Sequence, residues 1–171
     1  RLLASKAYAE RMTLHWMDVA RYGDSSVHHA DGPRTMWPWR DWVIDAYDKN
    51  KSFREFTIEQ LAGDLLPNAT KVQKLATAFN RQTLTNTEGG TDKEQWRVAA
   101  VMDRVETLGA VWLGLTVGCA RCHTHKYDQF AQKEYYQLLA YFNNGDETSS
   151  NVSRSKPEYE AWLKAKTAHD D

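Results

Sequence analysis

The chain has 171 residues, of which 42% are hydrophobic and 26% charged, with 22 basic against 23 acidic side chains. This length fits one domain with a sizeable core. The formal net charge of −1 excludes the basic surplus that a nucleic-acid-binding protein needs. No apolar run approaches the ~18 residues of a membrane-spanning helix. The chain opens inside a helical pattern, with no Met and no apolar leader, so we expect an excised domain whose targeting segment lies elsewhere.

Apolar residues recur at helical spacing along most of the chain, which predicts an all-α fold of about five to seven helices in a single domain around one ligand. The first predicted helix covers residues 2–22 and ends at Gly23. Its apolar face is formed by residues spaced three or four apart: Tyr8, Met12, His15 or Trp16, and Val19. A long irregular loop follows near residues 23–38, and loops of this length are usually functional or disordered.

Further helices are predicted at residues 39–47, 57–66, 71–79, about 92–115, and 132–142. The longest begins at Asp92 or Thr91 as N-cap. Its apolar residues alternate at spacings of three and four: Val98, Val101, Val105, Leu108, Trp112 and Leu115. Because residues 109–118 are apolar nearly all round, we expect them to be buried. We place the domain at residues 1–145, followed by a polar extension at 146–171 with a candidate short helix at 157–166.

Cys119-Ala120-Arg121-Cys122-His123 is a C-x-x-C-H run, the attachment signal for a c-type haem. In this chemistry the two thiols add across the two vinyl groups of the haem, and the imidazole of the next residue is held under the iron. The chain has two cysteines in all, and both belong to this run. We therefore predict one covalent haem c held by Cys119 and Cys122, with His123 as the proximal ligand of the iron.

The two cysteines have two alternative uses. Together with His123 and His125, Cys119 and Cys122 would offer four zinc ligands, but a structural zinc site normally draws its ligands from two separate segments. A thioredoxin-like redox pair needs a βαβ setting, which a helical chain does not provide. Haem would also explain the surplus of aromatic side chains, seven Trp, eight Tyr and five Phe, which we expect to line this large flat ligand.

The stretch from Leu113 to Asp128 resembles the planctomycete-type cytochrome c domain family, the second cytochrome-like module of large secreted multidomain proteins. Further matching stretches, spread over residues 1–145, are His15–Tyr22, Trp39–Ile44, Phe56–Asp64, Asn86–Gly90 and Asp103–Val105. One departure is Gln129-Phe130, where the family commonly has Pro-Ile. The resemblance implies a c-type haem domain, usually followed by a further domain, in proteins associated with polysaccharide use.

The sixth position of the iron has several candidates. All four methionines precede the motif, whereas small cytochromes often place the distal ligand after it. His15 lies three residues after Met12, beside the apolar face of the first helix, and is either a distal ligand, a residue of the distal pocket, or a core histidine bonded to Asp18. His28 and His29, on the polar loop, come next and are expected to be solvated. An iron with no protein ligand at this position would bind small molecules.

Charged residues on the helix that leads to the motif are candidates for holding the haem propionates. Arg97 and Arg104 lie seven residues apart on one side of that helix, and a guanidinium matches a carboxylate bidentately. The alternative is a solvated or salt-bridged helix face. A glycosidase-like carboxylate pair, such as Glu88 with Asp103, is a further alternative.

These observations favour a c-type cytochrome domain that transfers electrons in a secreted multidomain protein. Its partners would be redox proteins or flanking domains of the same chain, with no nucleic acid and no membrane span in this segment. We expect a periplasmic or secreted location, because covalent haem attachment by this motif is an extracytoplasmic step in bacteria. The alternative is a haem-dependent catalytic or gas- or peroxide-binding domain of a secreted enzyme linked to polysaccharide degradation. A third alternative is a mainly structural haem.

Overall fold

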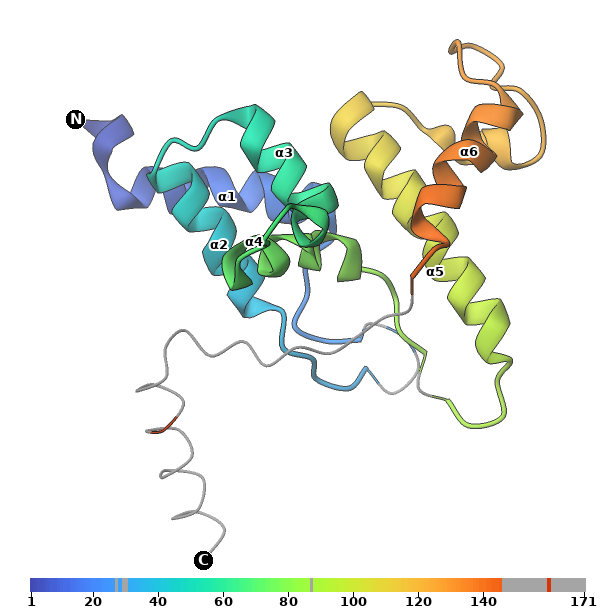
Figure 1. The fold of residues 1–171 in the computed structure, drawn as a ribbon, viewed down its shortest axis with the longest axis horizontal. Helices are drawn as coiled ribbons and strands as arrows, with labels where there is room; N and C mark the ends of the chain where they lie inside the picture. The colour runs from blue at the N-terminus through green and yellow to red at the C-terminus, as the bar shows by residue number, and fades with distance from the viewer. Residues whose placement is uncertain (27, 29–30, 87, 146–159, 161–171) are drawn as a thin grey trace, which may run out of the picture.

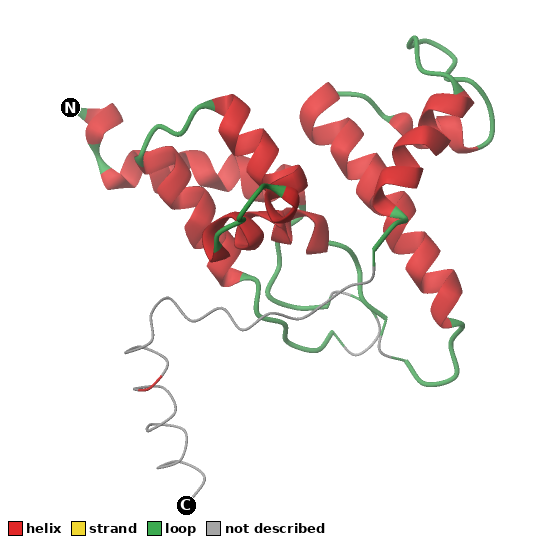
Figure 2. Cartoon of the chain, in the orientation of Figure 1, coloured by secondary structure: helices red, strands yellow, loops and turns green. Residues whose placement is uncertain are grey.

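The computed structural model describes residues 1–26, 28, 31–86, 88–145 and 160, which fold into helices joined by loops (Figure 1). The α-helices of this part of the chain are α1 (Lys6–Ala20), α2 (Trp37–Asp48), α3 (Phe53–Ala62), α4 (Lys71–Ala76), α5 (Lys93–Leu108) and α6 (Gln132–Phe142). The all-α prediction is confirmed, because no residue in the described ranges belongs to a strand, and strand-like pairing there is limited to isolated bridges such as the one between Ser25 and Pro33 (Figure 2). The predicted extension at 146–171, including the candidate helix at 157–166, lies outside the described residues except for Glu160.

Polar side chains begin several of these helices. Ser52 accepts a hydrogen bond from a backbone N–H in the first turn of α3, and Thr70 forms a reciprocal capping box with Gln73 at the start of α4. Asp92 accepts from the backbone N–H groups of the first turn of α5. The predicted N-cap at Asp92 is therefore confirmed. Within the described ranges, no helix is both long and apolar enough to cross a membrane.

The helices form two clusters, each with its own buried core. Helices α1 to α4 lie together on one side of the molecule, and α5 and α6 cross each other on the other side (Figure 1). We call these the first and the second cluster. The first core is aromatic and centres on Trp39, whereas the second is smaller and centres on Val105 and Tyr135.

The aromatic residues of the first cluster pack mainly against one another. The rings of Trp42 and Phe56 are stacked with their centroids 5.4 Å apart, and Phe79 meets Trp112 edge-to-face at 4.7 Å. Trp39 is fully buried between them and their neighbours. Edge-to-face and offset contacts of this kind let aromatic rings fill a core without a ligand. The expectation that the aromatic surplus lines a haem is therefore wrong for these buried rings.

The buried face of α1 differs from the predicted one. Its buried residues are Ala9, Thr13, Met17 and Ala20, whereas Val19 and His15 are exposed. Small side chains on this face allow α1 to pack closely on α2, which a pattern built only on large apolar residues does not reveal. The helix also ends before Gly23, because Arg21 adopts the left-handed conformation at its C-cap, with φ of 59°.

The long apolar run after Asp92 is broken where a continuous helix was expected. Helix α5 ends at Leu108 and passes into a π-helical turn, η4 (Gly109–Leu113), followed by Gly114 in the left-handed region with φ of 64°. The π turn directs Trp112 into the first cluster, where its Nε1 donates to Oγ1 of Thr57 over 3.0 Å. Part of this segment is exposed, and Leu113 is 51% exposed. The expectation that residues 109–118 are buried is therefore wrong.

Gly63, at the end of α3, marks a close contact between helices that a side chain would disrupt. A Cβ atom there would overlap the backbone carbonyl oxygen of Gln73 on α4. We expect Gly63→Ala to lower the free energy of unfolding by about 1–3 kcal/mol, the usual cost of overpacking, as measured by urea denaturation. Gly89→Ala is the control, since a Cβ at Gly89 meets nothing within 4 Å. Equal stabilities of the two variants would contradict this packing.

Candidate functional site

The C-x-x-C-H run begins in a short 3₁₀-helix, η5 (Val117–Arg121), with Cys122 as its C-cap. A 3₁₀-helix has three residues per turn, so residues three apart lie on the same face. The segment from Val117 to Cys122 therefore has three faces. They are formed by the pairs Val117 and Ala120, Gly118 and Arg121, and Cys119 and Cys122.

The first face anchors η5 in the core of the second cluster. Val117 is 1% exposed and Ala120 is fully buried, and both pack with Val105 of α5 and Tyr135 of α6. The backbone of Gly109 approaches this face so closely that an added Cβ would lie 2.7 Å from Cγ2 of Val117. Burial of this face fixes the orientation of the other two.

The cysteine face points outward. Cys119 and Cys122 are both exposed, and both are free thiols. The backbone N–H of Cys122 donates to the carbonyl of Cys119 over 3.4 Å, which closes the turn between them. The fold thus presents two thiols side by side on the surface of a turn whose opposite face is buried.

His123 follows on the same exposed turn. Its Nδ1 lies 2.7 Å from the backbone carbonyl oxygen of Thr124. A carbonyl oxygen can only accept a hydrogen bond, so in the neutral imidazole this contact places the proton on Nδ1 and leaves Nε2 with its lone pair. Histidines that bind metals usually have this arrangement, with one ring nitrogen donating to a carbonyl and the other available as ligand.

His125 has a different role, which is to hold the loop after the motif. Its Nδ1 accepts from the backbone N–H groups of Asp128 and Tyr127, over 2.9 and 3.3 Å. The backbone N–H of His125 donates to the carbonyl of Phe130 over 2.9 Å, and the side chain of His125 is 9% exposed. His125 is therefore a structural residue of the loop.

The tetrahedral zinc alternative receives no support from the geometry. Among the residues that the structure describes, no group of three or more His, Cys, Asp or Glu side chains is placed to hold a metal ion.

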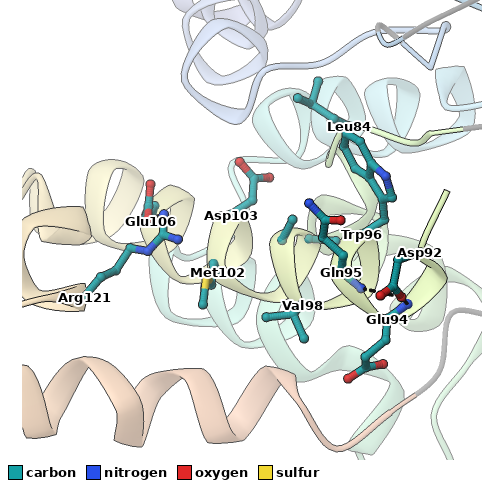
Figure 3. A pocket seen from close by; sticks show the side chains of 12 residues that line it. Leu84, Asp92, Glu94, Gln95, Trp96, Val98, Met102, Asp103, Glu106 and Arg121 are labelled. Atoms are coloured by element: carbon teal, nitrogen blue, oxygen red, sulfur yellow. Dashed lines mark hydrogen bonds and ion pairs between the residues drawn. The ribbon is translucent and has the colours of Figure 1, made fainter.

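An open groove of about 680 Å³ runs along α5 next to the motif. Arg121 reaches it from η5 and points toward Glu106, while Trp96 and Leu84 lie at the other end (Figure 3). Met102 also lines the groove, between these ends. Its volume falls within the range of about 300–1,000 Å³ that is common for small-molecule sites.

The two arginines predicted to hold propionates have other partners. Arg97 donates through Nε and Nη2 to the carboxylate of Glu94 over 2.7 and 2.8 Å, which lowers the pKa of Glu94, and through Nη1 to Asn143 over 2.7 Å. Arg104 is 9% exposed, and its Nε donates to the carbonyl of Asn80 over 2.7 Å, where the two clusters meet. These contacts agree with the salt-bridge alternative for Arg97 and with a packing role for Arg104.

The histidines that were candidates for the sixth position of the iron lie on other elements than the C-x-x-C-H run. His15 is exposed on α1, in the first cluster, so its ring does not point into the core as the spacing indicated. His28 is half-buried, with its ring 4.7 Å from that of Trp96, rather than solvated. His29 lies outside the described residues.

Sequence reasoning missed Arg121 as a candidate functional residue. It is the motif residue that lines the groove, and its Nη1 lies 3.5 Å from Oε1 of Glu106. The sequence did contain a signal for Arg121, because a basic residue between the two cysteines lies close to any group that the cysteines bind. Glu106 had no such signal, since its position near the motif depends on the turn at η4.

Comparison with protein-family models matches residues 1–147 to PSCyt2, a family described as "Protein of unknown function (DUF1549)". No curated protein and no solved structure matches the chain. The matched range includes α1 to α6 and the whole C-x-x-C-H run.

Proposed function

The chain belongs to the PSCyt2 family, and from this membership and the arrangement of its C-x-x-C-H run we propose that it is a c-type cytochrome domain that carries one covalent haem and transfers electrons. Cys119 and Cys122 would form the two thioether bonds, and His123 would be the proximal ligand. We call residues 117–123 the attachment turn. The observation that carries the proposal is the pairing of two exposed thiols on one face with a histidine whose Nδ1 is bonded to a carbonyl.

The buried residues and the histidine of the attachment turn have separate roles in this proposal. The buried pair Val117 and Ala120 keeps the turn rigid, so the two thiols keep a fixed spacing. The carbonyl of Thr124 holds the neutral ring of His123 in the tautomer whose Nε2 carries the lone pair. A haem bound here supplies a one-electron redox couple.

Exposure of the attachment turn supports electron transfer. Cys119, Cys122 and His123 are all exposed, so a group that they hold would lie at the surface of this chain, within reach of a redox protein or a flanking domain. Covalent attachment by this motif also implies a periplasmic or secreted location. The groove next to Arg121 favours a second candidate function, in which the haem domain binds a gas, a peroxide or a substrate of a secreted enzyme.

Absorption spectra of the chain, produced together with a bacterial haem-attachment system, test the proposal. We expect a c-type pyridine haemochrome and one haem per chain, retained after denaturation. The electron-transfer function predicts low-spin iron and reversible reduction without binding of CO, whereas the second function predicts that CO or cyanide binds to the native protein. A protein that carries no covalent haem under these conditions would contradict both candidate functions.

His15 remains a proposed distal ligand, and the same spectra test it. His15→Ala would lose the low-spin signature if His15 binds the iron. An unchanged spectrum would assign the sixth position to another group.

A further inference from the structure

The carboxylate of Glu106 packs against the attachment turn on the face formed by Gly118 and Arg121. A Cβ atom added to Gly118 would lie 3.1 Å from Cδ of Glu106 and 3.2 Å from each of its carboxylate oxygens. Glycine at this position therefore gives the carboxylate room to lie against the backbone, one residue before Cys119.

The same carboxylate has two long polar contacts. Nη1 of Arg121 and the hydroxyl of Tyr135 each lie 3.5 Å from Oε1 of Glu106. Tyr135 is fully buried, and this burial, followed by the charge of Glu106, raises its pKa to about 12, so the hydroxyl stays protonated at neutral pH. Both contacts are at the limit of hydrogen-bond length, so neither is a strong hydrogen bond to the carboxylate.

Other residues hold the backbone of the turn. The carbonyl of Arg121 accepts from Nε2 of Gln132 over 3.1 Å and from the hydroxyl of Tyr136 over 3.0 Å, and both donors belong to α6. The charges of Glu106 and Arg121 can therefore be removed without removing these anchors or the buried pair Val117 and Ala120.

We propose that Glu106 and Arg121 form a pair of opposite charges that sets the reduction potential of the group held by Cys119 and Cys122. This inference rests on the proposed function. Glu106 favours the ferric state, which carries one more positive charge than the ferrous state, and Arg121 favours the ferrous state. Fixed charges and hydrogen bonds near a haem are among the means by which proteins set its potential.

The experiment measures the midpoint potential of the haem in Glu106→Gln and Arg121→Gln by spectroelectrochemical titration of the haem-loaded chain. Glutamine keeps the shape of Glu106 and removes its charge. We expect an upward shift for Glu106→Gln, a downward shift for Arg121→Gln, and a value close to that of the wild type for the double variant. Loosening of the turn alone would not produce shifts of opposite sign.

Glu94→Gln is the matched control for loss of a carboxylate on the same helix. It lies twelve residues before Glu106, about 18 Å along the helix axis, which exceeds the Debye length of about 10 Å at 0.1 M salt. We expect the midpoint potential of the haem in Glu94→Gln to equal that of the wild type.

Unchanged potentials in both single variants, or shifts of the same sign, would overturn the inference and leave the proposed function intact. A wild-type chain without covalent haem would overturn the proposed function, and the inference with it. The two failures are thus distinguished by the haem content of the wild type.

Discussion

Replacing Cys119 and Cys122 together by alanine is expected to abolish covalent haem attachment and to leave the fold unchanged. Both side chains are exposed and unbonded, and exposed substitutions usually change the free energy of unfolding by less than about 0.5 kcal/mol. Mass spectrometry of the denatured protein measures attachment. Thermal unfolding of the cofactor-free chain, compared with cofactor-free wild type, measures the fold.

His123→Ala is the comparison for this experiment. It keeps both thiols, so we expect covalent attachment to persist, with an altered spectrum because the proximal ligand is lost. Haem that stays covalently bound in the double cysteine variant would contradict the assignment of the attachment residues. A large loss of stability in the cofactor-free double variant would contradict their exposed position.

Trp39→Ala is expected to lower the free energy of unfolding by about 3–5 kcal/mol, the cost of emptying the site of a large buried aromatic side chain. Trp39 is fully buried, and its ring lies 6.2 Å from that of Tyr22 and 6.2 Å from that of Phe79, centroid to centroid. Such a loss is a large part of the total stability of a typical domain, about 5–15 kcal/mol. Urea denaturation of the cofactor-free chain measures it.

Trp37→Ala is the matched control, because it removes the same side chain from the same helix. Trp37 is 37% exposed, so we expect a smaller loss of stability than for Trp39. A comparable loss in the two variants would show that the aromatic core is not centred on Trp39.

The helices were predictable where apolar residues repeat regularly between clear start and stop signals. The spacing predicts 132–142, the bounds of α6, and places a helix at 39–47, within α2. The predicted helix at 71–79 is formed by α4 and the 3₁₀-helix η3 (Thr77–Arg81). In each of these segments the local pattern and the tertiary packing favour the same structure.

The wrong predictions for the buried face of α1 and for the end of α5 have a common physical cause. Small residues contribute little to the hydrophobic pattern of a sequence. Ala9 and Ala20 determine the buried face of α1, although larger neighbours suggested another face. Gly114 turns the chain after η4, and Gly109 leaves room for Val117 beside its backbone, although the apolar pattern continues through both. Close contacts between backbones depend on small side chains, and an apolar periodicity does not detect them.

The position of the candidate site was predictable to the extent that it is local in sequence, while its haem chemistry stays a prediction. Cys119, Cys122 and His123 are identified by their spacing, whereas Glu106 reaches the same turn through the fold. Arg97 and Arg104 fit a propionate role by spacing alone, but in the structure Arg97 bonds Glu94 and also Asn143, the C-cap of α6, and Arg104 bonds the carbonyl of Asn80 in the first cluster. Residues that act across helices require the three-dimensional arrangement to be found.

The three faces of η5 also bear on how the protein can change during evolution. Size limits Val117 and Ala120, the carboxylate of Glu106 limits Gly118, and the exposed Cys119 and Cys122 are limited only by the haem attachment proposed for them. Since these constraints fall on different residues, the proposed attachment residues can change in a descendant without a change in how this segment folds. The stability of the helical scaffold is in this sense separate from the chemistry that we propose for it.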